Sequence, residues 1–333
     1  MKRLDIRTAA ALGLALWMAW PSAWAQTIRD PALEALYTAG RTQDLHRASA
    51  QRVQAQADDA PAVLGLALAA LEMDETSARR QAITAAEACV ARQPRAGACH
   101  YALGVTLGVQ AMVDGMLKAA RSAGTVREAL STALEIDTSW YPARSALVEF
   151  YLLAPGIMGG STSRATELAG SAPRAEQVLA LQARVAMADR RLEAAVQGLA
   201  KLPTALEHAL ASDVQAWSVQ AGLGLVNEGQ WAKAQGLLER CLRNRPDDAG
   251  ALYALGRARG EAGEPAQALK LYEQAAAAKN ASAWPVQYRV GLTLEQLGRP
   301  DEAKAAFKRH IAAAKGPKNL LEEARKRVEA LGG

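Results

Sequence analysis

The sequence predicts an all-α protein, a right-handed superhelical solenoid of stacked helix–turn–helix repeats. The strongest observation is a glycine that recurs three times, at spacings of 34 and 35 residues. Each glycine is followed twelve residues later by an alanine, and four residues after that by a large apolar residue. A fixed period of about 34 residues with one order of residue types is typical of repeats built from two helices. The recurring residues are Gly222, Gly256 and Gly291, then Ala234, Ala268 and Ala303, then Leu238, Tyr272 and Phe307.

The three clear repeats occupy residues 214–316, and each has a glycine where its first helix should end. Glycine readily adopts the left-handed conformation that closes a helix. Two of the three turns continue with proline, at Pro265 and Pro300, where the first turn of a helix tolerates a residue without an N–H. We therefore expect two antiparallel helices in each repeat. The turn glycines are Gly229, Gly263 and Gly298.

These helix hairpins resemble the tetratricopeptide repeat, because three copies keep its register of small and large residues. The last copy departs from the pattern at His310, which suggests a solvated end. The resemblance implies a superhelix of about eight helix pairs with a concave groove lined by the first helix of each repeat. The best matches to the pattern are Gly256, Ala268, Tyr272 and Ala275 in one copy and Gly222, Ala234 and Pro246 in another.

The first 25 residues predict a secretory signal peptide. Basic residues at Lys2 and Arg3 precede an apolar run, and the small-x-small sequence that ends at Ala25 is typical of a cleavage site before Gln26. An uncleaved anchor is the alternative. The segment resembles a bacterial export signal, so we expect the mature chain in the periplasm.

Removing this segment takes three of the 39 basic residues and one of the 34 acidic ones, which leaves a net charge of +3. A small excess spread over a long chain does not indicate a nucleic-acid binder. No later apolar run is long enough to span a membrane, so we expect no transmembrane segment in the mature chain.

Weaker copies of the repeat precede the clear ones. Residues 26–108 keep the period, since Ala70 and Gly104 are 34 residues apart. Residues 109–213 form enlarged and degenerate repeats, because the register slips by 13 residues after Gly104. The slip falls in an amphipathic insertion at 109–124 with three large apolar residues, Met112, Met116 and Leu117. They could make an adaptable binding surface, but the expected alternative is that they extend a helix and pack inside.

The loop at 154–163 contains the sequence Ala-Pro-Gly-Ile-Met-Gly-Gly-Ser, which should stop one helix at Pro155 and start another after Gly160. It resembles a long-loop variant in a group of uncharacterised exported bacterial tetratricopeptide proteins, a resemblance that brings no activity with it. No lysine follows Gly160 and no strand precedes the loop, so we interpret it as a structural turn rather than a phosphate site. Residues 317–333 should form a capping helix with one apolar stripe.

The sequence contains no recognisable catalytic constellation. Its four histidines are scattered without metal-ligand spacing, and no nucleophile-elbow sequence occurs. We predict no catalytic residues, no metal site and no cofactor.

Two of the three cysteines lie close in the repeat pattern. Cys89 falls late in one helix and Cys99 near the start of the next, so the turn between them could bring them together. We expect a disulfide in an oxidising compartment, with two buried thiols as the alternative. Cys241 stands at a small-residue position of its repeat and should be a packed free thiol.

By the tetratricopeptide resemblance, fixed positions of each first helix face the groove. Tyrosine beside arginine and polar neighbours suits an extended peptide, because it combines apolar contact with charge-assisted hydrogen bonds. The lysine and asparagine set that grips a terminal carboxylate in some co-chaperones is not reproduced. The predicted groove residues are Val219, Leu223 and Asn227, then Tyr253, Arg257 and Glu261, then Tyr288, Leu292 and Glu295.

The sequence therefore favours a non-enzymatic periplasmic scaffold that holds a protein or peptide partner, expected to be another envelope protein, in its groove. One alternative is a small-ligand or glycan binder that uses the 109–124 insertion and the 154–163 loop. Another is an accessory subunit of a secretion or polysaccharide export assembly. The sequence names neither the partner nor the oligomeric state, because a repeat scaffold hosts many functions.

Overall fold

The computed structural model describes residues 26–73, 75–313 and 318–332. Within these ranges every regular element is a helix and no strand occurs, so the predicted all-α solenoid of stacked helix pairs is confirmed. The signal peptide predicted at residues 1–25 lies outside the described residues. No helix in the described ranges is both long and apolar enough to cross a membrane.

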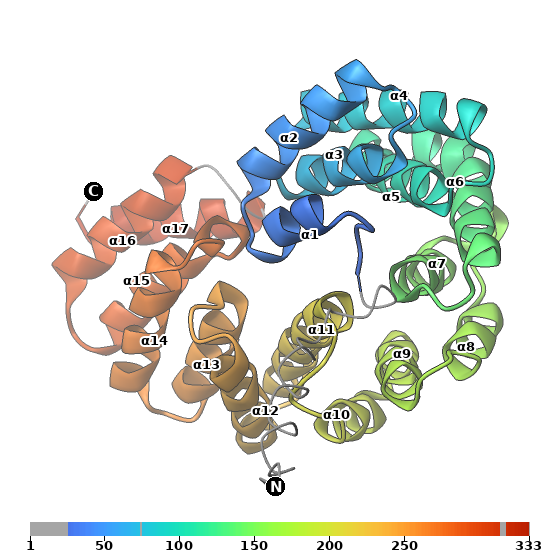
Figure 1. The fold of residues 1–333 in the computed structure, drawn as a ribbon. Helices are drawn as coiled ribbons and strands as arrows, with labels where there is room; N and C mark the ends of the chain where they lie inside the picture. Colours follow the sequence, from blue (N-terminus) through green and yellow to red (C-terminus); the bar gives the residue numbers. More distant parts are fainter. Residues whose placement is uncertain (1–25, 74, 314–317, 333) are drawn as a thin grey trace, which may run out of the picture. The chain divides into compact units, whose positions relative to one another are not determined.

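The chain divides into two compact units after Gly160, unit 1 at residues 1–160 and unit 2 at residues 161–333. The boundaries expected after residues 108 and 213 from the repeat register stay predictions. Within each unit a helix packs chiefly against its neighbours in sequence, as Figure 1 shows by the gradual change of colour.

The helices of unit 1 form a continuous stack. Its centre is α3, which is apolar on every side and buried from Ala62 to Ala70, between α2 on one side and α4 and α5 on the other. The elements of unit 1 are α1 (Pro31–Thr38), α2 (Thr42–Ala55), α3 (Ala60–Met73), α4 (Thr76–Arg92), α5 (Gly97–Asp114), α6 (Met116–Ile136), α7 (Tyr141–Leu153) and the 3₁₀ turn η2 (Gly156–Met158).

Unit 2 contains the three clear repeats, as the pairs α11–α12, α13–α14 and α15–α16. The capping helix expected near the C-terminus is present as α17, packed on α16. The elements of unit 2 are α8 (Thr162–Gly170), α9 (Ala175–Ala188), α10 (Leu192–Ala200), α11 (His208–Asn227), α12 (Trp231–Asn244), α13 (Ala249–Glu261), α14 (Pro265–Ala277), η3 (Ala281–Ala283), α15 (Val286–Gln296), α16 (Pro300–Ala313) and α17 (Lys318–Ala330).

The repeating glycines are places of close helix approach. A Cβ atom at Gly256 would stand 2.6 Å from Cε1 of Tyr272, and one at Gly291 would stand 2.5 Å from Cε1 of Phe307. These distances are shorter than any normal contact, so the large apolar residue of the second helix occupies the space that a side chain would need. The period in the sequence therefore reflects one packing contact repeated in each helix pair.

The turns between paired helices also follow the prediction. Gly229, Gly263 and Gly298 have φ values of 74°, 81° and 69°, the left-handed conformation that ends a helix. Pro265 and Pro300 begin the following helices.

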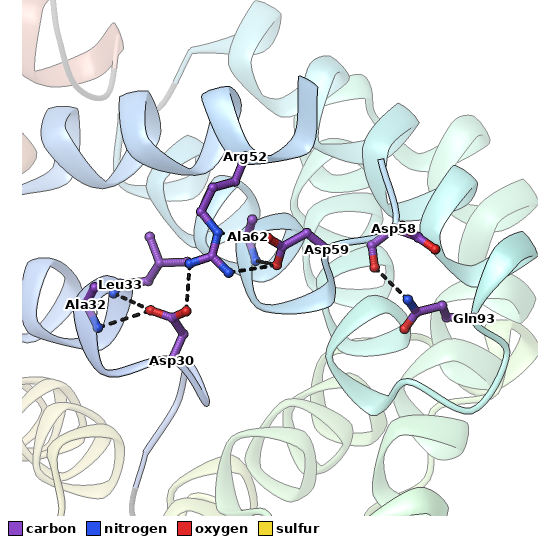
Figure 2. Close-up of polar contacts among 8 residues, drawn as sticks. All are labelled: Asp30, Ala32, Leu33, Arg52, Asp58, Asp59, Ala62 and Gln93. Carbon is purple, nitrogen blue, oxygen red and sulfur yellow. Dashed lines mark hydrogen bonds and ion pairs between the residues drawn. The ribbon is translucent and has the colours of Figure 1, made fainter. Parts of the chain in front are cut away.

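A polar network fixes the start of unit 1, as Figure 2 shows. The Arg52 guanidinium on α2 donates to Asp30 at 2.6 Å and to Asp59 at 2.8 and 3.0 Å. Asp30 also caps α1 by accepting from the N–H groups of Ala32 and Leu33 at 3.1 and 3.0 Å. Arg52 therefore joins the first helix to the turn before the third.

Cys89 on α4 and Cys99 on α5 are joined by a disulfide, with their Cα atoms 5.7 Å apart. Cys241 is a buried free thiol on α12, and burial raises its pKa to about 11. A thiol with so high a pKa is a poor nucleophile at neutral pH.

The glycines of the 154–163 loop give it a tight fold. Gly159 has a φ of 95°, and a Cβ atom at Gly160 would stand 1.7 Å from the carbonyl oxygen of Ala154. Within unit 2, Ser161 caps α8 by accepting from the N–H of Arg164 at 3.3 Å.

The 109–124 insertion differs from its prediction. It lengthens α5 and α6 as expected, but the expectation that its large side chains pack inside is wrong. Met112, Met116 and Leu117 are 66%, 70% and 70% exposed. They stand at the joined ends of two helices.

Candidate partner-binding surface

The predicted groove residues stand on α11, α13 and α15, the first helices of the three clear repeats. The structure sorts them by exposure. Asn227 and Glu261 are exposed, Leu223, Arg257, Leu292 and Glu295 are half-buried, and Val219, Tyr253 and Tyr288 are buried.

The burial of Val219, Tyr253 and Tyr288 corrects the prediction that they face a partner. Tyr253 packs against rings on both sides, 6.0 Å from Tyr272 and 5.3 Å from Trp284, centroid to centroid. Tyr288 lies 6.0 Å from Phe307. An aromatic side chain at this helix position is long enough to reach the core between helices, where it buries most of its apolar area.

Three predicted residues at the ends of α11 and α13 remain accessible. Nη2 of Arg257 donates to Oδ1 of Asn227 at 3.0 Å, which links two consecutive repeats. Glu261 lies one turn of α13 beyond Arg257 and is exposed. Cation, amide and carboxylate therefore stand side by side on one surface.

Arg289 of α15 joins this surface and was missed by the sequence analysis. It is hydrogen-bonded to the Tyr253 hydroxyl and interacts electrostatically with Tyr272 and Glu261. Burial alone would lower the pKa of Arg289, but these contacts outweigh it and the pKa is raised. Its position three residues before Leu292 puts both on one face of the helix, and this spacing could have identified it.

Arg257 and Arg289 are both half-buried. Their Nε atoms are buried and have no hydrogen-bond partner among the described residues. The half-buried side chains of Leu223 and Leu292 stand on α11 and α15. Two guanidinium groups beside apolar side chains can hold an extended peptide through charge-assisted hydrogen bonds and burial of its side chains.

The third repeat is covered by the capping helix. Arg327 of α17 is ion-paired with Glu295 and, at 3.1 Å, with Glu323. The Tyr288 hydroxyl donates to Glu323. Burial, and then this carboxylate, raise the pKa of Tyr288 to about 12. Glu295 and Tyr288 are thus engaged by the protein itself, and the accessible surface centres on α11 and α13.

A hollow of about 600 Å³ lies elsewhere, in unit 1, lined by residues that include His46, Gln54, Met73 and Gln81. Neither the 109–124 insertion nor the 154–163 loop contributes to it. The pocket that the sequence analysis considered between those segments therefore does not coincide with this hollow.

Residues 219–259 and 253–319 match the tetratricopeptide repeat family. The matched range covers the second half of α11 through α16, which includes most of the surface described above. No curated protein matches the sequence.

Solved structures with the same fold are distant in sequence. Human IFIT1, solved as a dimer with m7Gppp-AAAA, has 13% identity and a TM-score of 0.56 over 82% of this chain and 62% of that chain. The APC/C hetero-tetramer Cut9–Hcn1 has 13% identity and a TM-score of 0.52 over 91% of this chain and 55% of that chain. This chain thus spans little more than half the length of these proteins, and the likeness shows the fold alone.

Proposed function

We propose that this protein is a non-enzymatic scaffold that binds a protein or peptide partner through the surface formed by Asn227, Arg257, Glu261 and Arg289. The observation that carries the proposal is the group of a cation, an amide and a carboxylate at the ends of α11 and α13, where Nη2 of Arg257 donates to Asn227 and Glu261 is exposed. The match of residues 219–319 to the tetratricopeptide repeat family supports it, because helix pairs of this kind present such surfaces to extended partners.

We further propose that the scaffold works in the bacterial periplasm and that its partner is another envelope protein. The support is the predicted export signal at residues 1–25 and the resemblance of the 154–163 loop to exported tetratricopeptide proteins. If the partner is permanently bound, the protein would be an accessory subunit of a secretion or export assembly.

In-cell crosslinking tests the surface directly. A photo-reactive residue at Glu261, which is exposed on α13, should give one dominant protein adduct. The matched control is the same probe at Lys270, which is exposed on the second helix of the same repeat. Identical adducts from both positions would contradict the assignment of the surface. An absence of protein adducts at Glu261 would instead favour a small-ligand or glycan binder.

A further inference from the structure

The two helices that contain the insertion are longer than their neighbours in unit 1. α5 has 18 residues and α6 has 21, against 14 in α3, 17 in α4 and 13 in α7. At about 1.5 Å per residue, α6 exceeds α7 by roughly 12 Å. The two helices pack along each other (Figure 1), and Gly115, with a φ of 93°, joins them.

The joined end is apolar. We call it the α5–α6 tip and define it as Met112, Val113, Gly115, Met116 and Leu117. Its four large side chains are between 54% and 70% exposed. They make up half of the exposed large hydrophobic residues in the described part of the chain. Isolated exposed apolar residues are ordinary, but four within six residues form a patch that indicates contact with another surface.

Basic side chains flank the apolar tip. Lys118 and Arg121 are exposed on the first turns of α6. The one acidic residue of the tip region, Asp114, is already engaged by Lys118 at 3.4 Å and by Gln110 at 2.9 Å. Asp114 offsets one of the two basic side chains, so the net charge beside the apolar side chains is positive.

We propose that the α5–α6 tip docks on an anionic lipid bilayer. The methionine, valine and leucine side chains enter the interface between headgroups, while Lys118 and Arg121 contact lipid phosphates. Interfacial segments sink by about 5–10 Å, which is less than the roughly 12 Å by which α6 exceeds α7. Apolar side chains combined with basic ones are the features that favour anionic membranes.

A contact between two copies of the chain fits the tip less well. A stable interface needs about 20–30 residues on each side, and the tip supplies four large side chains. A convex end also cannot fit an identical convex end closely, whereas a bilayer deforms around it.

Vesicle flotation tests the proposal. Vesicles of phosphatidylcholine that contain the anionic lipid phosphatidylglycerol, which attracts basic segments, are mixed with the protein purified from its expression host. Met116→Asp and Leu117→Asp should each weaken partitioning by about tenfold or more, since each removes one apolar side chain that would be buried in the bilayer. Ile157→Asp is the matched control, because Ile157 is 96% exposed but lies in the 154–163 loop, and it should change nothing.

The charge contribution is tested separately. The double variant Lys118→Glu, Arg121→Glu should weaken binding to the anionic vesicles and leave the weak binding to pure phosphatidylcholine unchanged. All variants have the same N-terminus, so any lipid affinity of residues 1–25, where they are retained, is common to them and cannot produce a difference.

Two results would overturn the proposal. One is partitioning that Met116→Asp and Leu117→Asp leave unchanged, which includes the case in which the wild-type protein does not float at all. The other is a wild-type dimer in solution that Met116→Asp dissociates, which would make the tip a contact between copies. Neither result bears on the surface of unit 2, whose crosslinking test is independent.

Discussion

The turn between α9 and α10 has Arg190 at the position where the clear repeats have glycine. Its φ is 60°, and it is the sole residue other than glycine with a positive φ in the described ranges. The N–H of Arg190 bonds to the carbonyl of Met187 at 3.0 Å, as that of Gly229 bonds to Val226 at 3.1 Å. The left-handed conformation costs a side-chain-bearing residue about 1–2 kcal/mol.

Arg190→Gly should therefore stabilise the protein, by about 1 kcal/mol after the greater freedom of glycine in the unfolded chain is subtracted. The measurement is the free energy of unfolding from urea titration. Arg191→Gly is the control, because Arg191 has a φ of −90° and its replacement should destabilise. If both variants lower the free energy of unfolding, the turn is not strained as described.

Gly256 is the residue where the close approach of paired helices can be tested. Gly256→Ala should destabilise by about 1–3 kcal/mol, because the new Cβ would stand 2.6 Å from the ring of Tyr272. Gly236→Ala is the matched control, since Gly236 also lies inside a helix but has no atom within 4 Å of its Cβ position. The control should stabilise by about 0.5–1 kcal/mol. Thermal unfolding of both variants distinguishes packing from helix propensity.

Asp30 should make stability depend on acid pH. Partial burial alone would raise its pKa, but the hydrogen bond from Arg52 and the N–H donors of α1 lower it below the usual value. A lowered pKa means that the carboxylate stabilises the folded state above the pKa of the unfolded chain, and that this contribution is lost as pH falls through the folded pKa. Asp30→Asn should cost about 1–3 kcal/mol at pH 7, and the difference from wild type should shrink below pH 4 in chemical denaturation. A difference that is constant with pH would show that the charge is not responsible.

Among single residues, the sequence predicted those that recur in every repeat, but not those whose position depends on the length of the side chain. The turn glycines were identified because only their conformation permits the turn. Tyr253 and Tyr288 were misplaced because a helix position fixes the direction of the Cβ but not how far a long ring extends. The positive φ of Arg190 could not be predicted, because arginine rarely adopts this conformation and its sequence position does not identify the turn.

The capping helix α17 buries fewer residues than any other α-helix of unit 2. Ala324 is its one buried residue, whereas α13 buries nine. Ala324→Glu should detach α17, because a buried carboxylate without a partner costs several kcal/mol. Hydrogen exchange should then speed up over residues 318–330 while α13 stays protected. Arg325→Glu, at an exposed neighbouring position, should leave exchange unchanged, and equal effects from the two variants would refute this account of the anchor.

The insertion shows what element-scale prediction lacked. The 13-residue slip after Gly104 falls in the stretch that forms the long helices α5 and α6, and helices were expected there. Whether Met116 and Leu117 would be covered depended on the lengths of the adjoining helices, and α7 is eight residues shorter than α6. A pattern of apolar residues records the preference of each side chain but not whether a neighbour is present to bury it.

For the molecule as a whole, the fold was predictable because its contacts are mostly between elements adjacent in sequence. Each helix pair needs only its neighbours, so a local period specifies the architecture. The division after Gly160 was not predicted, because a continuous repeat pattern has no marker for where packing between pairs weakens.

Because each helix pair packs only on its neighbours, a substitution on the binding surface can weaken partner binding without unfolding the protein. Arg257→Ala should reduce the crosslinking yield of a probe at Glu261 severalfold, because it removes one of the two guanidinium groups and the hydrogen bond to Asn227. The far-UV circular dichroism should not change, since the lost contact is an exposed one worth about 1 kcal/mol or less. Lys270→Ala is the control for the loss of a cation elsewhere. Unchanged yield in the Arg257 variant would move the docking surface away from α13.

Because Cys89 and Cys99 form a disulfide, unit 1 reaches its full stability only in an oxidising compartment. A loop this short contributes about 2–3 kcal/mol when it is closed, and closing it removes two electrons that an oxidant must accept. In a reducing cytosol the pair stays as thiols, so a newly made chain would hold its N-terminal half in a weaker, more easily unravelled form. Under the export proposed above, the less stable chain would be easier to keep unfolded until it crosses the membrane. Oxidation on the far side would then set the finished structure in place.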